Sequence, residues 1–314
     1  MEEKIFVIFN TGCIKYVLAT NTLVQNIKLY YPEAKIVFVC NKQTFDAAKY
    51  QTCVNDTIVY DDMKQNNFKS IINFALNFPY KKPFASFVTD SGIKNLLISR
   101  LIGTKHIISN NKFILLNTDE KYELRNYVHI KDKLAGMIEA LTNQHKNLPI
   151  RYLPPEINNA LIQKIKEIQK PVLLTVTSNN ENRIMPLNDC AELLNLLSAE
   201  GFTPIFAGES SIAKEYANNL KKAGCLNFID IVDCTTFTEF ANIMKICGSC
   251  ISVNNGALQL ANALQIPVVG IFYDNSADIW KSDTNLYPAK TIGDEHNTPI
   301  NIIQAYKELI GLGK

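Results

Sequence analysis

Short apolar runs alternate along this chain with segments in which apolar residues recur at helical spacing. The runs 5–9, 34–40, 84–88 and 172–176 are rich in apolar, β-branched and aromatic residues. Continuous apolar runs of this length are typical of strands buried on both faces, and the segments between them predict the covering helices. Because alternating strands and helices build parallel sheets, we predict an α/β fold.

The alternation continues through both halves of the chain. In the first half we expect strands at 5–9, 34–40, 57–60, 84–88, 106–109 and 113–116. The helices expected there are one that ends near 31, then 44–49, 68–78, 93–102 and one within 119–141. In the second half the expected strands are 172–176, 204–207, 228–232, 251–253 and 267–271. The expected helices are 157–168, 189–200, 212–223, 237–247, 257–264 and 300–309.

Residues 147–156, with the sequence NLPIRYLPPE, interrupt this alternation. They contain three prolines and show neither a helical nor a strand period, which favours a linker. A chain of 314 residues is long enough for two domains. We therefore predict one α/β domain at 1–150 and another at 151–299, with the last helix, 300–314, packing back on the first. Some binding proteins and kinases share such an arrangement, so architecture alone does not identify the function.

Composition narrows the classes of function. The chain is 47% hydrophobic and 20% charged, with a net charge of +2, which gives no overall electrostatic signal for nucleic-acid binding. No apolar run reaches the roughly 20 residues that a membrane-spanning helix needs. The charged start at 2–4 leads directly into a predicted strand and is unlike a signal peptide. We therefore expect a cytoplasmic protein.

The cysteines and histidines do not form a recognisable metal motif. Cys247 and Cys250 have a spacing that redox and zinc sites use, but no second pair completes a zinc site. Buried, reduced thiols are the favoured interpretation of all eight cysteines, because free cysteine behaves as a small hydrophobe. The four histidines are scattered, so no metal is expected.

The stretch 250–272 combines a strand, a polar turn, a helix and a second strand. Its turn is Asn254, Asn255 and Gly256, between a β-branched run and a segment of strong helix formers. A turn between the end of a parallel strand and a helix N-terminus offers free amides and a favourable dipole to an anion such as a phosphate. The alternative is an ordinary connection in which Asn caps the helix and Gly supplies an unusual backbone conformation.

This stretch resembles the signature of glycosyltransferase family 9, the heptosyltransferases of lipopolysaccharide core synthesis. The family pattern Ser-x-Asp-Thr-Gly-x-x-His-Leu-Ala-x-Ala-Leu-x-x-Pro-x-Val-x-Leu-Phe stands here at 252–272 as SVNNGALQLANALQIPVVGIF. Further similarity covers 23–36, 96–103, the segment around Pro186 and 206–209. The resemblance implies the GT-B fold, in which two Rossmann-like domains face each other across a cleft, and transfer of a sugar from a nucleotide-diphosphate sugar.

Several positions depart from the family pattern. The signature Asp, Thr and His are Asn254, Asn255 and Gln259 here. The Lys of the family's Lys-x-Trp-Pro element corresponds to Arg183 and its Trp to Met185. The family's N-terminal Gly-Asp, whose carboxylate is thought to serve as the base, aligns with Lys15-Tyr16, or with Gly12-Cys13 after a shift of three residues. Neither register supplies a carboxylate.

Donor binding needs amides and cations that meet the charge of the diphosphate leaving group. Hydroxyls at Thr177 and Ser178 and a bidentate guanidinium at Arg183 suit that task, and Glu209 suits a ribose hydroxyl. The alternatives are a solvated loop cation for Arg183 and a helix cap for Glu209 with Ser210. The expected donor-binding residues are Thr177, Ser178, Arg183, Gly208, Glu209, Asn254, Asn255, Gly256 and Gln259.

Acceptor activation needs a base. Asp90 follows a predicted strand of the first domain and is the catalytic candidate, with the N-cap of the next helix as its alternative role. Lys15, Tyr16 and Lys94 are the expected acceptor-binding residues.

Two hypotheses follow for the function. The first is an active transferase of a cell-envelope glycan or lipid-linked acceptor, using a nucleotide-diphosphate sugar, peripheral at the inner face of the membrane, with no nucleic-acid partner. The second is a catalytically degenerate relative that binds a nucleotide, a sugar or a partner. The departures at Asn254, Gln259 and Lys15 favour the second, whereas Arg183 and the Asn255-Gly256 turn favour the first.

Overall fold

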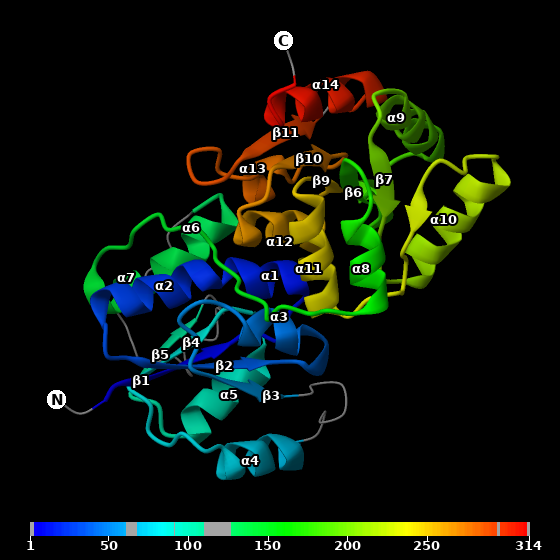
Figure 1. Ribbon diagram of the computed structural model, residues 1–314. Coiled ribbons are helices and arrows are strands. Elements are labelled where there is room, and N and C mark those ends of the chain that lie inside the picture. Colours follow the sequence, from blue (N-terminus) through cyan, green and yellow to red (C-terminus); the bar gives the residue numbers. More distant parts are fainter. Residues whose placement is uncertain (1–2, 61–67, 91, 110–126, 294–295, 313–314) are drawn as a thin grey trace. The chain divides into compact units, whose positions relative to one another are not determined.

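The chain folds into two compact α/β units, Met1–Leu153 and Pro154–Lys314 (Figure 1). The boundary falls inside the proline-rich stretch 147–156. In this computed structural model the described residues are 3–60, 68–90, 92–109, 127–293 and 296–312. The strand expected at 113–116 and the first part of the helix expected within 119–141 lie outside them.

The first unit contains a parallel sheet with the strand order β3-β2-β1-β4-β5. Its strands are β1 (Ile5–Phe9), β2 (Lys35–Cys40), β3 (Asp56–Val59), β4 (Ala85–Val88) and β5 (His106–Ser109). Its helices are α1 (Ile14–Ala19), α2 (Asn21–Tyr30), α3 (Phe45–Lys49), α4 (Phe68–Asn77), α5 (Ile93–Leu101), α6 (Ile130–Ala135) and α7 (Glu139–Thr142). Apolar side chains of β1, β2 and β4 pack against α4 and α5 in one core. The alternate residues Phe6 and Ile8 of β1 are fully buried as well, so both faces of this strand are covered, as its continuous apolar run predicts.

The second unit contains a parallel sheet with the order β11-β10-β9-β6-β7-β8. Its strands are β6 (Pro171–Thr175), β7 (Thr203–Phe206), β8 (Ile229–Asp230), β9 (Cys250–Val253), β10 (Val268–Phe272) and β11 (Ala289–Gly293). Its helices are α8 (Ala160–Lys166), α9 (Leu187–Ala199), α10 (Ser211–Lys222), α11 (Phe237–Cys247), α12 (Gly256–Leu264), α13 (Ala277–Trp280) and α14 (Pro299–Leu309). The predicted α/β class is therefore confirmed, and β11 and α13 are elements that the apolar pattern did not reveal.

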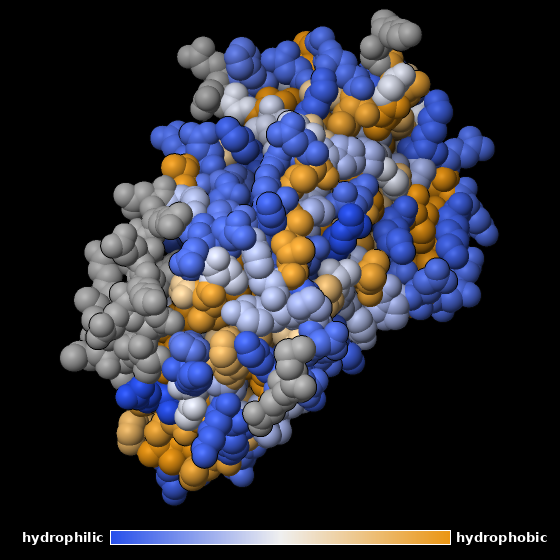
Figure 2. All heavy atoms as spheres, turned by 90° about the vertical axis from the view of Figure 1, so that its left-hand side faces the viewer, coloured by the Kyte–Doolittle hydropathy of each residue, from blue (hydrophilic) through white to orange (hydrophobic). Residues whose placement is uncertain are grey.

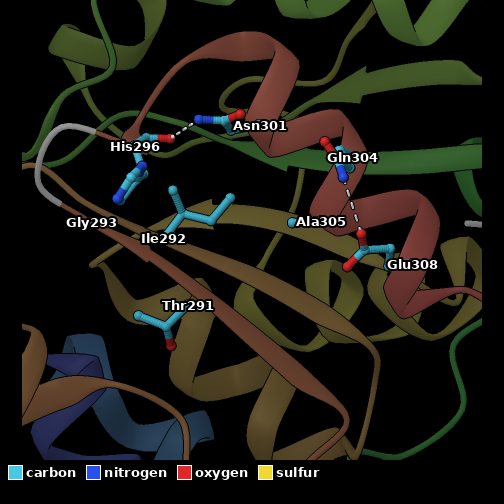
Figure 3. Close-up of a pocket in the computed structure, with 8 residues that line it drawn as sticks. All are labelled: Thr291, Ile292, Gly293, His296, Asn301, Gln304, Ala305 and Glu308. Carbon is cyan, nitrogen blue, oxygen red and sulfur yellow. Dashed lines mark hydrogen bonds between the residues drawn. The ribbon is translucent and has the colours of Figure 1, made fainter.

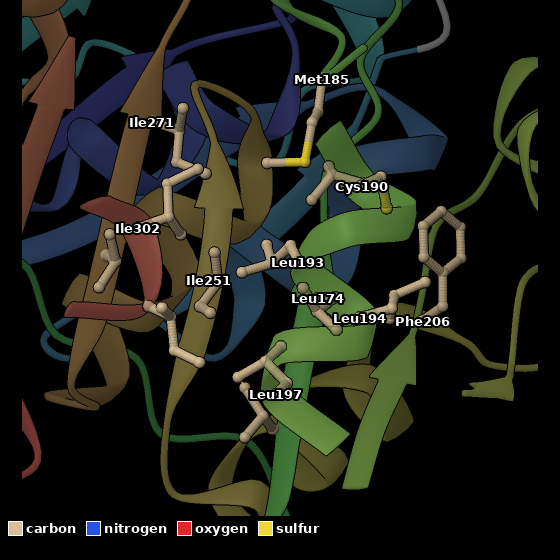
Figure 4. Packing of buried hydrophobic residues seen from close by; sticks show 14 of the residues in the cluster. Leu174, Met185, Cys190, Leu193, Leu194, Leu197, Phe206, Ile251, Ile271 and Ile302 are labelled. Carbon is tan, nitrogen blue, oxygen red and sulfur yellow. The ribbon is translucent and has the colours of Figure 1, made fainter. Parts of the chain in front are cut away.

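The core of the second unit lies between its sheet and the apolar face of α9 (Figure 4). Leu193, Leu194 and Leu197 recur at helical spacing and are fully buried against strand residues such as Ile251 and Ile271. Helix α11 begins at a capping box in which Thr236 and Glu239 satisfy each other's backbone amides. Local signals in the sequence thus fix both the faces and the ends of these helices.

Helix α14 belongs to the second unit. The sequence predicts that this helix packs on the first domain, but in the structure it packs on α9, β10 and β11. Ile302, Ile303 and Tyr306 are buried in the same core as α9, and the Tyr306 hydroxyl hydrogen-bonds to Ser249 Oγ at 2.8 Å. The helix packs there because its apolar face is buried in the core of its own unit.

Both sheets reverse their strand order at one point. The chain runs outward from β1 through β2 to β3 and then returns to the other side of β1 with β4; in the second sheet it returns beside β6 with β9. The loops at the two sides of such a reversal diverge, which leaves a crevice at the carboxyl ends of the strands where α/β proteins bind ligands. Among the described residues no helix is both long and apolar enough to cross a membrane.

The position of α14 can be tested by one matched pair of substitutions. Ile302→Ala should lower the free energy of unfolding of the second unit by about 2–5 kcal/mol, because Ile302 is fully buried. Ile300→Ala on the same helix should change it by less than about 0.5 kcal/mol, because Ile300 is 61% exposed. Urea unfolding measures both, and equal effects of the two substitutions would contradict this packing.

Candidate functional site

Asn255 joins the two strand ends at the reversal of the second sheet. It is the N-cap of α12, where its Oδ1 accepts hydrogen bonds from the Ala257 amide and from Ser252 Oγ, both at 2.9 Å. Its Nδ2 donates to the carbonyls of Thr175 and Thr177 at 3.1 and 3.0 Å. The side chain is therefore fully engaged in holding β9 and α12 against the end of β6. These contacts position the turn.

The groups that remain for a ligand lie around this turn. Gly256 is the first residue of α12, where a backbone amide has no partner within the helix. The Thr177 hydroxyl makes no hydrogen bond with any residue that the structure describes, and it lies at the same strand edge. A Cβ on Gly208 would come within 3.3 Å of Thr177 Oγ1 and 2.7 Å of Ala213 Cβ, so only glycine fits there. The structure thus brings Thr177, Gly208 and Gly256 to the carboxyl edge of neighbouring strands.

Arg183 is held by a residue that sequence reasoning missed. Its Nε donates to the carboxylate of Asp274, which follows β10, 91 residues further along the chain. Asp274 also accepts from the Ser276 hydroxyl, which in turn accepts from Asn254 Nδ2. The loops after β6, β9 and β10 are therefore linked by one chain of hydrogen bonds. The polar residues at 273–276, directly after an apolar strand, are the signal that could have identified this loop.

The orientation of the Asn254 side chain follows from this chain of hydrogen bonds. The single hydroxyl hydrogen of Ser276 goes to the Asp274 carboxylate, so Ser276 Oγ must accept from the amide nitrogen of Asn254. Asn254 is 1% exposed, and its Oδ1 has no hydrogen-bond partner among the described residues. The signature turn thus contains a buried amide whose donor side is used and whose acceptor side is not.

Asp274 is an ionised partner for Arg183. Burial alone would raise the pKa of the Asp274 carboxyl, but hydrogen bonds from Ser276 and Arg183 and the charge of Arg183 together hold that pKa below its ordinary value. Both side chains are about four-fifths buried. Because Asp274 occupies only Nε, the two terminal nitrogens of the Arg183 guanidinium are left without a hydrogen-bond partner among the described residues. These terminal nitrogens provide the fork that binds a phosphate bidentately.

The remaining donor-site candidates differ in their roles. Gln259 is buried, and its Nε2 donates to the Trp280 carbonyl at 3.1 Å, so it supports α13. Ser178 Oγ accepts from the Asn180 amide at 3.2 Å in the loop before Arg183. Ser210, not Glu209, is the N-cap of α10, while Glu209 is exposed beside Gly208 at the end of β7.

Asp90 joins the strand ends at the reversal of the first sheet. Its Oδ2 accepts from the backbone amide and the hydroxyl of Thr11, each at 2.8 Å, and from Asn95 Nδ2 at 2.8 Å. Its Oδ1 accepts from the Gly92 amide at 3.1 Å. The N-cap of α5 is Gly92, so the alternative role as N-cap does not apply to Asp90. The carboxylate instead links the loop after β1 to the start of α5.

The loop after β1 is held from its other side as well. Asn10 Oδ1 accepts from the Gly12 amide at 3.1 Å, and Asn41 Nδ2 donates to the Thr11 and Gly12 carbonyls at 2.8 and 3.2 Å. Lys15 and Tyr16 follow on α1, with Lys15 Nζ 5.9 Å from the centre of the Tyr16 ring. Lys94 is half-buried in the first turn of α5. Thr11, Asn41 and Asn95 were not predicted, because their importance depends on which strands are neighbours.

Five of the eight cysteines are buried, as expected, whereas Cys13, Cys53 and Cys234 are exposed, so that expectation is wrong for these three. Cys247 and Cys250 are free and buried, and burial raises the pKa of the Cys247 thiol to about 12 and also raises that of Cys250. Neither thiol is poised to ionise near neutral pH. In the described part of the chain no three Cys, His, Asp or Glu side chains are arranged to hold a metal ion.

A shallow depression on the second unit lies elsewhere, between β11 and α14 (Figure 3). Its one carboxylate, Glu308, is paired with Lys290 and accepts a hydrogen bond from Gln304. None of the predicted site residues lines it. The depression therefore does not replace the strand edge as the candidate site.

Known proteins resemble this chain in sequence pattern and fold. The pattern of glycosyltransferase family 9 (heptosyltransferase) matches residues 101–299. The structure of a family 9 glycosyltransferase from Veillonella parvula DSM 2008 matches with a TM-score of 0.82 and 13% identity, over 99% of this chain and 98% of the other. The E. coli ADP-heptose LPS heptosyltransferase II matches with a TM-score of 0.78 and 15% identity, over 98% of both chains.

A third match is the E. coli heptosyltransferase WaaC, solved with ADP-2-deoxy-2-fluoro heptose. Its TM-score is 0.73 at 13% identity, over 99% of this chain and 100% of the other. No curated protein sequence matches significantly. Structural matches at such low sequence identity establish only the fold, which is GT-B. The family pattern, by contrast, covers more than half of the chain. This protein is therefore a member of glycosyltransferase family 9, as its signature turn at Asn254–Gly256 predicts.

Proposed function

We propose that this protein transfers a sugar, a heptose or a related one, from a nucleotide-diphosphate sugar to a cell-envelope glycan or other acceptor. In this reaction the acceptor oxygen attacks the anomeric carbon, the bond from that carbon to the diphosphate breaks, and a base takes the acceptor proton. The leaving group gains negative charge, so its binding site should concentrate donors and cations.

The proposed donor site is inferred mainly from the position of the Arg183 guanidinium. Asp274 fixes it through Nε and leaves its terminal nitrogens for phosphate oxygens. The Thr177 hydroxyl and the N-terminus of α12 at Gly256 lie at the sheet reversal to which Arg183 is linked through Asn254. Glu209 is exposed at the end of β7, where a ribose hydroxyl could be bound. We therefore place the diphosphate between Thr177, Ser178, Arg183 and the turn at Asn254–Gly256.

The structural neighbours supply the first donors to test. The WaaC structures contain ADP and a fluorinated ADP-heptose, and heptosyltransferase II is described as acting with ADP-heptose. We propose that an ADP-sugar occupies the corresponding edge of this chain. The acceptor is proposed to be a glycan or lipid-linked molecule reached by Lys15, Tyr16 and Lys94, with the protein peripheral at the inner face of the membrane.

A second candidate function is ligand or partner binding without transfer. The oxygens of Asp90 already accept hydrogen bonds from Thr11, Gly92 and Asn95, and Lys15-Tyr16 stands where the family pattern has a carboxylate. Those observations favour a structural role for Asp90. A catalytic role requires that the acceptor hydroxyl displaces or joins the Thr11 hydroxyl as a donor to Oδ2.

Removal of the Arg183 guanidinium tests the donor site. Arg183→Ala should weaken ADP binding by about 1.5–3 kcal/mol, because a charged hydrogen-bonding partner of the phosphates is lost. Arg151→Ala removes an exposed arginine of the first unit and serves as the matched control. Isothermal titration calorimetry gives both affinities. Unchanged affinity in the Arg183 variant would remove this residue from the site.

Asp274→Asn tests the partner of Arg183 through its pH dependence. The Asp274 pKa is lowered in the folded state, so ionised Asp274 stabilises the fold above its unfolded-state pKa of about 3.9. That stabilisation is lost as the pH falls through the lower folded-state pKa. Wild type should exceed the variant by roughly 1 kcal/mol in free energy of unfolding at pH 5–7.

The difference should shrink below pH 4 in urea unfolding. A difference that is independent of pH would show that the charge of Asp274 contributes nothing. Asp278→Asn, an exposed aspartate on α13 paired with Lys281, is the control.

Asp90→Asn distinguishes the transferase from the binding protein. If Asp90 is the base, the rate of sugar transfer should fall by about 10²- to 10⁴-fold while ADP affinity is unchanged. Asp56→Asn, which alters another carboxylate of the first unit, should leave the rate unchanged. Transfer is measured with an ADP-sugar, and unfolding temperatures are compared in parallel.

A loss of rate that follows a loss of stability would assign Asp90 a structural role. Full activity in a stable variant would exclude it as the base. A wild type that binds donor without turning it over would favour the binding function.

A further inference from the structure

Helix α4 exposes one apolar flank. Phe68, Ile72 and Leu76 are spaced by four residues and lie along one side of the helix, with Phe68 64% and Leu76 69% exposed. On the opposite flank Phe74 packs on the ring of Tyr60 just after β3, with ring centroids 4.7 Å apart. Helix α4 also packs against α5.

Helix α5 continues this apolar surface. Ile93, Leu97 and Leu101 have the same spacing, and Ile93 and Leu101 are each 47% exposed, while Leu96 and Ile98 point into the core. Two neighbouring helices thus show apolar side chains to solvent, which is uncommon for a surface without a partner. Figure 2 shows hydrophobic residues at the lower end of the first unit, where α4 lies in Figure 1. We call this the α4–α5 surface, defined by Phe68, Ile72, Leu76, Ile93, Leu97 and Leu101.

The segment that carries α4 and α5 is rich in basic residues. Residues 68–109 contain six lysines and arginines and one aspartate, whereas the whole chain has only two more basic than acidic residues. The one aspartate is Asp90, which is engaged with Thr11 and Asn95. Lys69 lies on α4 and Arg100 on α5, and both are exposed. Long basic side chains can place their aliphatic parts among lipid chains while their charges reach phosphate groups.

We propose that the α4–α5 surface binds an anionic phospholipid bilayer. Exposed apolar residues next to clustered Lys and Arg are the combination by which proteins lie at a membrane interface. The choice of a bilayer over a second copy of this chain rests on charge, because two such surfaces facing each other would bring together like charges. This proposal rests on the proposed function. Because Lys94 and Asp90 lie at the start of α5, a lipid-linked acceptor held at the bilayer would meet the first unit there.

Vesicle co-sedimentation of the full chain tests this surface. Binding should be stronger to vesicles of phosphatidylethanolamine with phosphatidylglycerol than to vesicles of phosphatidylcholine, and it should weaken with salt. Leu76→Ser and Leu101→Ser should each weaken binding roughly tenfold, because an apolar side chain no longer enters the interface. Leu226→Ser, on the second unit and 74% exposed, is the matched control and should bind as wild type does.

Charge variants form the second arm of the experiment. Lys69→Gln and Arg100→Gln should each weaken binding about fivefold, and the control Lys222→Gln on α10 should not. All these side chains are exposed, so unfolding temperatures should stay close to that of wild type. Equal binding to both kinds of vesicle, or variants that bind as tightly as wild type, would overturn the proposal.

Two further measurements separate the alternatives. If light scattering shows a dimer that Leu76→Ser dissociates, the surface belongs to a second copy and the bilayer proposal is wrong. ADP titration of the same preparations distinguishes this inference from the proposed function. Vesicle binding with the expected variant effects but no ADP binding would support the surface and reject the donor site.

Discussion

The Asn255 side chain is the contact on which the second unit's site depends. It caps α12 with its oxygen and holds the end of β6 with its nitrogen, so both strands at the sheet reversal share one amide. All its hydrogen-bonding groups are engaged within the protein, and a residue without both donor and acceptor could not replace it. Because the amide of Gly256 and the hydroxyl of Thr177 are positioned by this contact, the ligand-binding potential of the edge follows from it.

In the first unit a carboxylate makes the corresponding connection. Asp90 joins the end of β4 to the loop after β1, which Asn41 fixes from the neighbouring strand. Both reversals thus carry a polar side chain that spans two strand ends. The reversal of strand order opens the crevice where ligands bind, and it also separates two strand ends that a side chain must then connect. A side chain with this structural role therefore lies beside the ligand-binding crevice.

Electrostatics distinguish the donor edge further. Arg183 takes the place of a lysine in the family pattern, and its guanidinium has room for Asp274 at Nε and a phosphate at its terminal nitrogens. A lysine has a single charged nitrogen and could not serve two partners in one plane in the same way. The nearby Asn254 is neutral and bonds to Ser276, so the one carboxylate in this network is Asp274. The charges therefore remain paired although the pattern of residues has changed.

The sequence by itself determined the α/β class, most of the buried strands, the turn at Asn254–Gly256 and the family. These are local properties: a strand buried on both faces is a continuous apolar run, and a helix start needs a capping residue. Only the tertiary structure decided the packing of α14, the pairing of Arg183 with Asp274 and that of Thr11 with Asp90. Those contacts join residues far apart in the chain, and they depend on the strand order. The edge strand β11 also escaped prediction, because it lacks the continuous apolar run of a strand covered on both faces.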